Sequence, residues 1–366
     1  MGTNSCPVNL TTGPIAIPQD VQEIFGRLPV SHRSDEFIAV FKKLQLKLCK
    51  ATGAKHVVFM TGSGTLANEA MIARIKIGGQ HGLILTNGEF GNRLISQAER
   101  QGLSFETVEK EWGEPYEISE IEAKIKNAPG VSWLMFTHCE SSSGCIADMT
   151  ALTALGIKYG IKICVDAMST IGNIPLNLKD VYIATCSSGK GLGSLAGIGI
   201  VFTQKELLPD ERIPKYLDLG YYFSCNGIPF TISSNLIMAL DKAVDYSLKE
   251  GRTRQIEKLS ELLLSKVCEI KGLQVLNKKS RILSHIITII PPTGIDAVQL
   301  GERIKILGVE TSFNSGYLKE RNQLQIAIMG QHDEEDILAF VSGLKVALKE
   351  LGSAKTITSP RRAFTS

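Results

Sequence analysis

This chain of 366 residues has no long apolar run, no large excess of charge and no closely paired cysteines. Its 40 Lys and Arg residues nearly balance its 37 Asp and Glu residues, and a formal net charge of +3 does not indicate a nucleic acid or a membrane surface as partner. The longest apolar runs, such as residues 284–291, are far shorter than the roughly 20 residues of a transmembrane helix. Residues 1–10 lack the basic segment and apolar core of a signal peptide. These absences predict a cytoplasmic protein with no membrane partner and no nucleic-acid partner.

The eight cysteines form no Cys-x-x-Cys pair, and several lie inside apolar runs, as Cys164 does between Ile163 and Val165. This distribution is typical of reduced, buried thiols and not of a metal site or a disulfide framework. We therefore expect no metal site.

From about residue 55 the sequence alternates short β-rich runs with stretches of helical length. Runs that are apolar on both faces indicate strands covered on both sides, as in a parallel sheet. The predicted strands are residues 56–60, 83–86, 104–108, 132–136, 163–165 and 182–186. Their alternation with helices predicts a doubly wound α/β fold with a mostly parallel central sheet. Residues 197–203 follow after a short connection and are expected to form an antiparallel strand of that sheet.

A long helical zone follows, interrupted at Gly251. Beyond it, alternating strand and helix patterns predict a smaller α+β C-terminal domain, with elements at residues 284–290, 295–307, 324–329 and 334–351. We divide the chain into four parts: an N-terminal arm (1–20), a large domain with the linking helix (21–260), a small C-terminal domain (261–352) and a polar tail expected to be disordered (353–366).

A glycine turn stands between the first predicted strand and a helix that begins near Leu66. Its residues Ser63, Gly64 and Thr65 offer hydroxyls beside the N–H groups of a helix N-terminus, an arrangement that binds phosphate. The same turn is also an ordinary way to cap a helix. It lacks the Gly-x-Gly-x-x-Gly spacing of dinucleotide sites and the lysine of a P-loop, which argues against NAD and ATP.

Two charged residues follow neighbouring strands. Asp166 ends the apolar run that contains Cys164, and Lys190 comes 24 residues later between Gly189 and Gly191. Ligands of open α/β sheets bind beyond the carboxyl ends of the strands. Asp166 could instead cap the next segment, and Lys190 could be a solvated charge. A lysine in a tight apolar turn is, however, a good candidate for an amine with a lowered pKa.

Pyridoxal 5′-phosphate (PLP) requires three groups, namely a phosphate cup, a carboxylate for its pyridinium nitrogen and a lysine for its aldehyde. The glycine turn, Asp166 and Lys190 supply all three at the ends of predicted strands. The sequence therefore predicts a PLP enzyme whose cofactor is held as a Schiff base on Lys190.

The motifs resemble those of class V aminotransferases, which belong to the fold-type I PLP-dependent transferases. The resemblance is strongest to the 2-aminoethylphosphonate–pyruvate and alanine–glyoxylate (serine–pyruvate) transaminases. It runs from Asn9-Leu10-Thr11-Thr12-Gly13-Pro14 and Ser31-His32-Arg33-Ser34, through the glycine turn, to Met329-Gly330. It implies a homodimer with shared active sites, in which residues 21–260 bind PLP.

The resemblance also implies roles for single residues. Lys190 would form the Schiff base, Asp166 would contact the pyridine nitrogen, and Phe90 would stack on the ring, unless it is only a core aromatic. Thr231 would reach the phosphate of the neighbouring subunit. The other residues implied at the cofactor are Ser63, Gly64, Thr65, Ser141 and Ser188, and the substrate side would include Gly13 and Gln325.

Two departures from the family pattern concern the substrate side. Gly189 stands where the family usually has Gln or Asn, and Gln325 stands where the family has the arginine that clamps the substrate carboxylate. Arg93 and Arg321 could replace that arginine, or they could make only surface salt bridges.

We expect an aminotransferase that moves an amino group from a small amine, aminophosphonate or amino acid donor to an oxo acid such as pyruvate or glyoxylate. A PLP-dependent lyase or desulfurase on the same fold, and a non-catalytic binding protein, are the alternatives.

Overall fold

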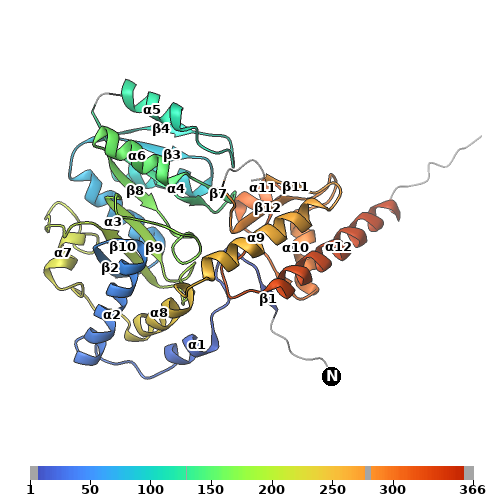
Figure 1. The fold of residues 1–366 in the computed structure, drawn as a ribbon, viewed down its shortest axis with the longest axis horizontal. Helices are drawn as coiled ribbons and strands as arrows, with labels where there is room; N and C mark the ends of the chain where they lie inside the picture. The colour runs from blue at the N-terminus through green and yellow to red at the C-terminus, as the bar shows by residue number, and fades with distance from the viewer. Residues whose placement is uncertain (1–6, 129, 277–281, 358–366) are drawn as a thin grey trace, which may run out of the picture.

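The computed structural model describes residues 7–128, 130–276 and 282–357, which form a large and a small unit (Figure 1). The large unit is built on a seven-stranded sheet in the order β2-β10-β9-β8-β5-β3-β4. In that order the strands are β2 (His56–Thr61), β10 (Ile198–Thr203), β9 (Ile183–Ser187), β8 (Lys162–Asp166), β5 (Val131–Thr137), β3 (His81–Thr86) and β4 (Phe105–Glu109). The strands from β9 to β4 pair in parallel, and β10 is antiparallel to both neighbours. The predicted α/β fold, the mostly parallel sheet and its antiparallel strand are therefore confirmed.

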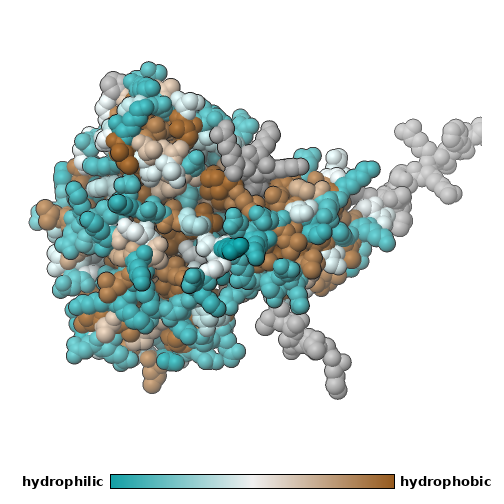
Figure 2. Space-filling model, viewed as in Figure 1, coloured by the Kyte–Doolittle hydropathy of each residue, from teal (hydrophilic) through white to brown (hydrophobic). Residues whose placement is uncertain are grey.

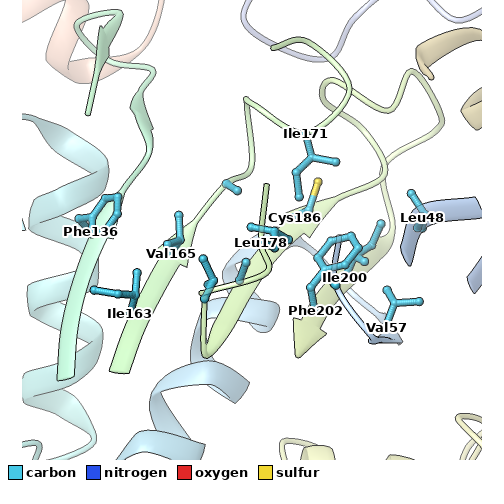
Figure 3. Packing of buried hydrophobic residues seen from close by; sticks show 14 of the residues in the cluster. Leu48, Val57, Phe136, Ile163, Val165, Ile171, Leu178, Cys186, Ile200 and Phe202 are labelled. Carbon is cyan, nitrogen blue, oxygen red and sulfur yellow. The ribbon is translucent and has the colours of Figure 1, made fainter. Parts of the chain in front are cut away.

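Helices cover both faces of this sheet because successive side chains of each strand point to opposite sides. One face packs against α2 (Asp35–Thr52), α5 (Ile118–Asn127), α6 (Met149–Tyr159) and α8 (Ser234–Ser247). The other face packs against α3 (Gly64–Lys76), α4 (Glu89–Arg100) and α7 (Leu219–Ser224). Figure 3 shows the first of these cores, which extends across the sheet from Phe136 of β5 to Phe202 of β10 and Leu48 of α2. Each large side chain buried there contributes about 1.5–3 kcal/mol.

Helix α2 illustrates how local sequence builds this layer. The Ser34 hydroxyl accepts a hydrogen bond from the Phe37 N–H and caps the helix at its start. Gly53 ends it with φ of 74°, a left-handed conformation that glycine adopts without strain. Between these two residues, Phe37, Phe41, Leu44 and Leu48 recur every three or four positions and are buried against the sheet.

The small unit contains a three-stranded antiparallel sheet. It consists of β11 (Gln274–Val275), β12 (Ile286–Ile290) and β14 (Leu324–Ala327). The helices α9 (Arg252–Cys268), α10 (Ala297–Ile306) and α12 (Glu334–Ile357) pack on it in a separate hydrophobic core. Its remaining elements are β13 (Val309–Glu310) and the short helix α11 (Gly316–Glu320).

The predicted break at Gly251 is confirmed, since α8 ends at Ser247 and α9 begins at Arg252. The boundary expected at residue 261 falls inside α9, whose Ile256 and Leu259 already lie in the core of the small unit. Helix α12 continues past Gly352 to Ile357. Residues 353–357 of the tail that was expected to be disordered are therefore helical. The rest of that tail lies outside the described residues.

The N-terminal arm connects the two units. Strand β1 (Val8–Asn9) pairs with β13, and Leu10 lies in the core of the small unit. Helix α1 (Gln19–Phe25) packs on α8 of the large unit through Val21. The visible face of the molecule is largely hydrophilic with smaller hydrophobic areas (Figure 2). No helix among the described residues is long and apolar enough to cross a membrane.

Candidate active site

Asp166 and Lys190 lie at one edge of the large sheet. Asp166 is the last residue of β8, and Lys190 follows β9 in the loop that leads to β10. Because β8 and β9 are neighbours and parallel, their carboxyl ends meet at the same edge. The fold thus places the two charges together, as their positions in the sequence predicted.

Asp166 is 4% exposed, and both of its carboxylate oxygens accept hydrogen bonds. Asn68 Nδ2 donates to one oxygen at 2.8 Å, and the Met168 N–H donates to the other at 3.0 Å. Thr185 of β9 holds the amide of Asn68 by donating its hydroxyl to Oδ1 at 2.6 Å. A buried carboxylate with two donors has a fixed orientation.

The Lys190 amine points toward the N-terminal arm and donates a hydrogen bond to the Thr12 carbonyl at 2.6 Å. A Cβ atom on Gly13 would lie 2.9 Å from Nζ, and Gly13 has φ of +134°. Both observations require glycine at position 13. Gly13, expected on the substrate side, therefore leaves room for the amine.

Burial affects the two charged groups in opposite directions. It lowers the pKa of Lys190, an effect that Asp166 opposes and that the positive charge of Arg93 reinforces. Burial also raises the pKa of Asp166, while the hydrogen bonds from Asn68 and Met168 and the charge of Lys190 lower it. An amine with a lowered pKa is neutral, and hence nucleophilic, more often than an ordinary lysine.

The glycine turn forms the start of α3, with Ser63 as N-cap residue. Ser63 and Thr65 are exposed, and the Ser63 side chain makes no capping hydrogen bond. A Cβ atom on Gly64 would lie 2.3 Å from the sulfur of Met168, so a larger residue here would have to displace that side chain. The turn thus presents hydroxyls and the N–H groups of a 13-residue helix, a suitable anion site.

Phe90 is held at the start of α4 by Glu140, a buried residue that the sequence analysis did not single out. The Glu140 carboxylate accepts hydrogen bonds from the N–H groups of Phe90 and Gly91 at 3.0 and 2.9 Å. The Phe90 ring meets Tyr317 of α11 at 6.4 Å between centroids. Phe90 is therefore not a core residue of the large unit but lies where the two units meet.

Ser141 and Gln325, both predicted site residues, lie together at this boundary. Both are buried, and Gln325 Nε2 donates to the Ser141 carbonyl at 2.7 Å. A chain of hydrogen bonds also connects Gln325 to Lys190. Its backbone pairs with Ser312, whose hydroxyl accepts from the N–H of Thr12, the residue that contacts the lysine.

Ser188 and Thr231 complete the set of predicted residues. The Ser188 hydroxyl donates to the Leu195 carbonyl at 2.6 Å and accepts from the Ile198 N–H, so it closes the lysine loop. Thr231 is exposed in the segment before α8. Within the described residues, no group of three or more His, Cys, Asp or Glu side chains could hold a metal ion.

A separate hollow of about 420 Å³ lies at the opposite end of the sheet. It is lined by Trp133 and Lys162, which stand near the beginning of β5 and β8. Since Asp166 ends β8, this hollow does not belong to the candidate site.

A strand-end carboxylate, a half-buried lysine on the next strand's loop and an open helix N-terminus are groups that suit PLP. The family model for class V aminotransferases matches residues 26–310. The chain therefore belongs to the class V aminotransferase family, whose cofactor is PLP.

Known proteins resemble the chain over nearly its whole length. The small subunit of a soluble hydrogenase from Synechococcus sp. is 28% identical over 93% of this chain and 92% of its own length. A 2-aminoethylphosphonate–pyruvate transaminase from Bacillus cereus is 27% identical over 91% of this chain and 95% of its own. The crystal structure of an alanine–glyoxylate aminotransferase from Nostoc sp. superposes with a TM-score of 0.84 at 25% identity, covering 94% of this chain and 96% of that structure.

The residues present fit PLP. The Lys190 amine donates to the Thr12 carbonyl and can be released from it to bind an aldehyde. Asp166 offers a buried negative charge for a pyridinium nitrogen. The exposed hydroxyls at the start of α3 suit a phosphate group.

Proposed function

We propose that this enzyme transfers an amino group from a small amine, aminophosphonate or amino acid donor to an oxo acid such as pyruvate or glyoxylate. The observation that carries the proposal is the position of half-buried Lys190 next to buried Asp166 at the carboxyl edge of the sheet. The named transaminases among the relatives support the reaction class.

Lys190 has two tasks in this proposal. It would hold the cofactor through its aldehyde, and its amine would serve as the base that takes a proton from the carbon bearing the amino group and as the acid that gives the proton back. Its lowered pKa suits the first half of that exchange, because a neutral amine accepts a proton. The Thr12 carbonyl, 2.6 Å away, then stabilises the protonated amine.

PLP, when bound, supplies an electron-withdrawing ring that makes the carbon proton acidic. Asp166 would keep the ring nitrogen protonated. The contacts from Asn68 and Met168 fix the position of the carboxylate, so that it does not reorganise during the reaction.

A homodimer with shared active sites is part of the proposal. Thr231 is exposed in the single chain, as expected of a residue that reaches the phosphate of a partner subunit. Leu28 and Leu46 are 91% and 72% exposed, and burial of such side chains by a second chain would be favourable. A cytoplasmic location is also proposed, because all seven described cysteines are free thiols.

The test is the dependence of turnover on an oxo acid. Holoenzyme is incubated with 2-aminoethylphosphonate, alanine or serine, and the visible absorbance of the cofactor is followed. An aminotransferase loses that absorbance with the donor and regains it when pyruvate or glyoxylate is added. Continued product formation without an oxo acid would instead establish a lyase or desulfurase, and purified protein without chromophore would favour a binding protein.

A further inference from the structure

Gln325 cannot bind a substrate carboxylate, although it occupies the position of the family's clamping arginine. Its Nε2 lies 2.7 Å from the Ser141 carbonyl, 2.8 Å from the Ser142 carbonyl and 2.9 Å from the Thr288 hydroxyl. The hydroxyl of Thr288 donates its own hydrogen to the Ser143 carbonyl, so it accepts from Gln325. An amide has two N–H hydrogens, and three acceptors already use them.

The other end of the same amide repels an anion. Gln325 is fully buried, and its Oε1 is a buried oxygen without a hydrogen-bond partner among the described residues. Three acceptors around Nε2 fix the orientation of the amide, so the oxygen cannot exchange places with the nitrogen. A carboxylate at this position would meet a second acceptor and no donor. The charge that receives the oxo acid must come from another residue.

Arg93 of α4 is placed to supply that charge. Its guanidinium carbon lies 4.8 Å from the centroid of the Phe90 ring. The described hydrogen bond of Arg93 uses Nε, which donates to Glu89 at 2.9 Å. The two terminal nitrogens remain as a fork, the geometry that binds a carboxylate through two hydrogen bonds. The positive charge also influences the pKa of Lys190, so it lies within electrostatic range of the amine.

Other arginines near the boundary between the units are engaged elsewhere. Arg252 donates to the carbonyls of Met329 and Gly330 at 2.6 and 3.2 Å. Arg321 lies over the Trp112 ring and not over Phe90, at 3.8 Å from the centroid, and one of its terminal nitrogens, Nη1, already donates to Glu320 at 3.2 Å. Neither guanidinium offers a free fork next to Phe90.

We infer that Arg93 receives the carboxylate of the oxo-acid substrate from the α4 side of the site, in place of the arginine that is absent at position 325. The inference rests on the proposed aminotransferase function. Glu89 competes with the substrate for Arg93, since the same guanidinium serves both carboxylates. Arg93 thereby favours substrates whose acid group approaches beside Phe90 over those that require a clamp at Gln325.

The experiment measures binding of oxamate, an unreactive analogue of pyruvate, to the holoenzyme by calorimetry, together with kcat and KM for pyruvate. Arg93→Gln should weaken oxamate binding and raise the KM for pyruvate by about tenfold or more, the order of one lost charge-assisted contact, with kcat changed much less. Arg93→Lys should retain part of the affinity. Glu89→Gln should tighten oxamate binding, because it removes the competing carboxylate.

Arg321→Gln is the matched control and should leave oxamate binding unchanged. Wild-type affinity in Arg93→Gln, or an equal loss in Arg321→Gln, would overturn the inference. If Arg93→Gln does not fold, wild-type oxamate affinity in both Arg93→Lys and Glu89→Gln would also overturn the inference. Failure of the proposed function is distinguishable, because the wild-type enzyme would then transfer no amino group to any oxo acid.

Discussion

Replacement of Asp166 by Asn tests the electrostatic half of the proposed site. Both oxygens of Asp166 accept from N–H groups, of Asn68 at 2.8 Å and of Met168 at 3.0 Å. In Asp166→Asn one oxygen becomes an NH₂ group, which must face one of these two donors. The variant therefore loses a buried hydrogen bond at a cost of about 1–3 kcal/mol in stability, offset in part because a buried charge is removed.

The catalytic loss should be larger than the structural one. Without the carboxylate, nothing at this position keeps the pyridine nitrogen protonated, and we expect kcat to fall by about 10²–10³-fold, or 2.7–4 kcal/mol, as for other preorganised electrostatic partners. The assay is kcat at saturating donor and oxo acid, with the melting temperature measured in parallel. Asp148→Asn is the control, because Asp148 caps α6 from an exposed position and Asn is an equally good cap. A kcat of Asp166→Asn within about threefold of wild type would show that Asp166 only ends a strand.

Three further predictions concern assembly, specificity and acid stability. Mixing Lys190→Ala chains with chains that carry a bulky replacement at Thr231 should restore activity to a mixture of two inactive proteins, since one site of each hybrid dimer is intact; no recovery after proven subunit exchange counts against shared sites. Gln325→Arg should improve turnover of alanine or serine relative to the natural donor, because a guanidinium supplies two charge-assisted hydrogen bonds of roughly 1.5–3 kcal/mol each. An unchanged preference would contradict the role assigned to this position. Burial lowers the pKa of His138 and of His285 to about 4. Because the unfolded chain binds these protons below a pKa of about 6.5, stability is full above that pH and falls as the pH approaches 4. At pH 5 the loss in the free energy of unfolding should be about 2 kcal/mol per histidine, measurable by urea titration at pH 7 and pH 5. Equal stability at the two pH values would refute the assignment.

The positions of Asp166 and Lys190 follow from local sequence patterns. Short apolar runs separated by helices predict parallel strands, and the ends of neighbouring parallel strands share one edge. The pattern thus brings together two residues that are 24 positions apart without any knowledge of tertiary contacts. The antiparallel strand β10 was predictable for a similar reason, because its connection is too short for a crossover helix.

The contacts that fix the site could not be predicted in this way. No sequence pattern distinguishes Asn68 from other polar residues of α3. Its hydrogen bond to Asp166 joins positions 98 residues apart. Glu140 is a charged residue that becomes buried only when α4 docks on it. The loop after β9 folds back so that the Ser188 hydroxyl donates to the Leu195 carbonyl, a contact seven residues along the chain. Each of these depends on packing between elements that single-sequence periodicity does not encode.

Reduction of the holoenzyme with borohydride tests directly whether Lys190 carries the cofactor. Borohydride converts a Schiff base to a stable secondary amine, so that the cofactor remains attached through digestion and can be located by mass spectrometry. A single labelled peptide is expected, the one that contains Lys190, and no label in Lys190→Ala. A label on another lysine, or no label on a protein that carries the chromophore, would contradict this expectation.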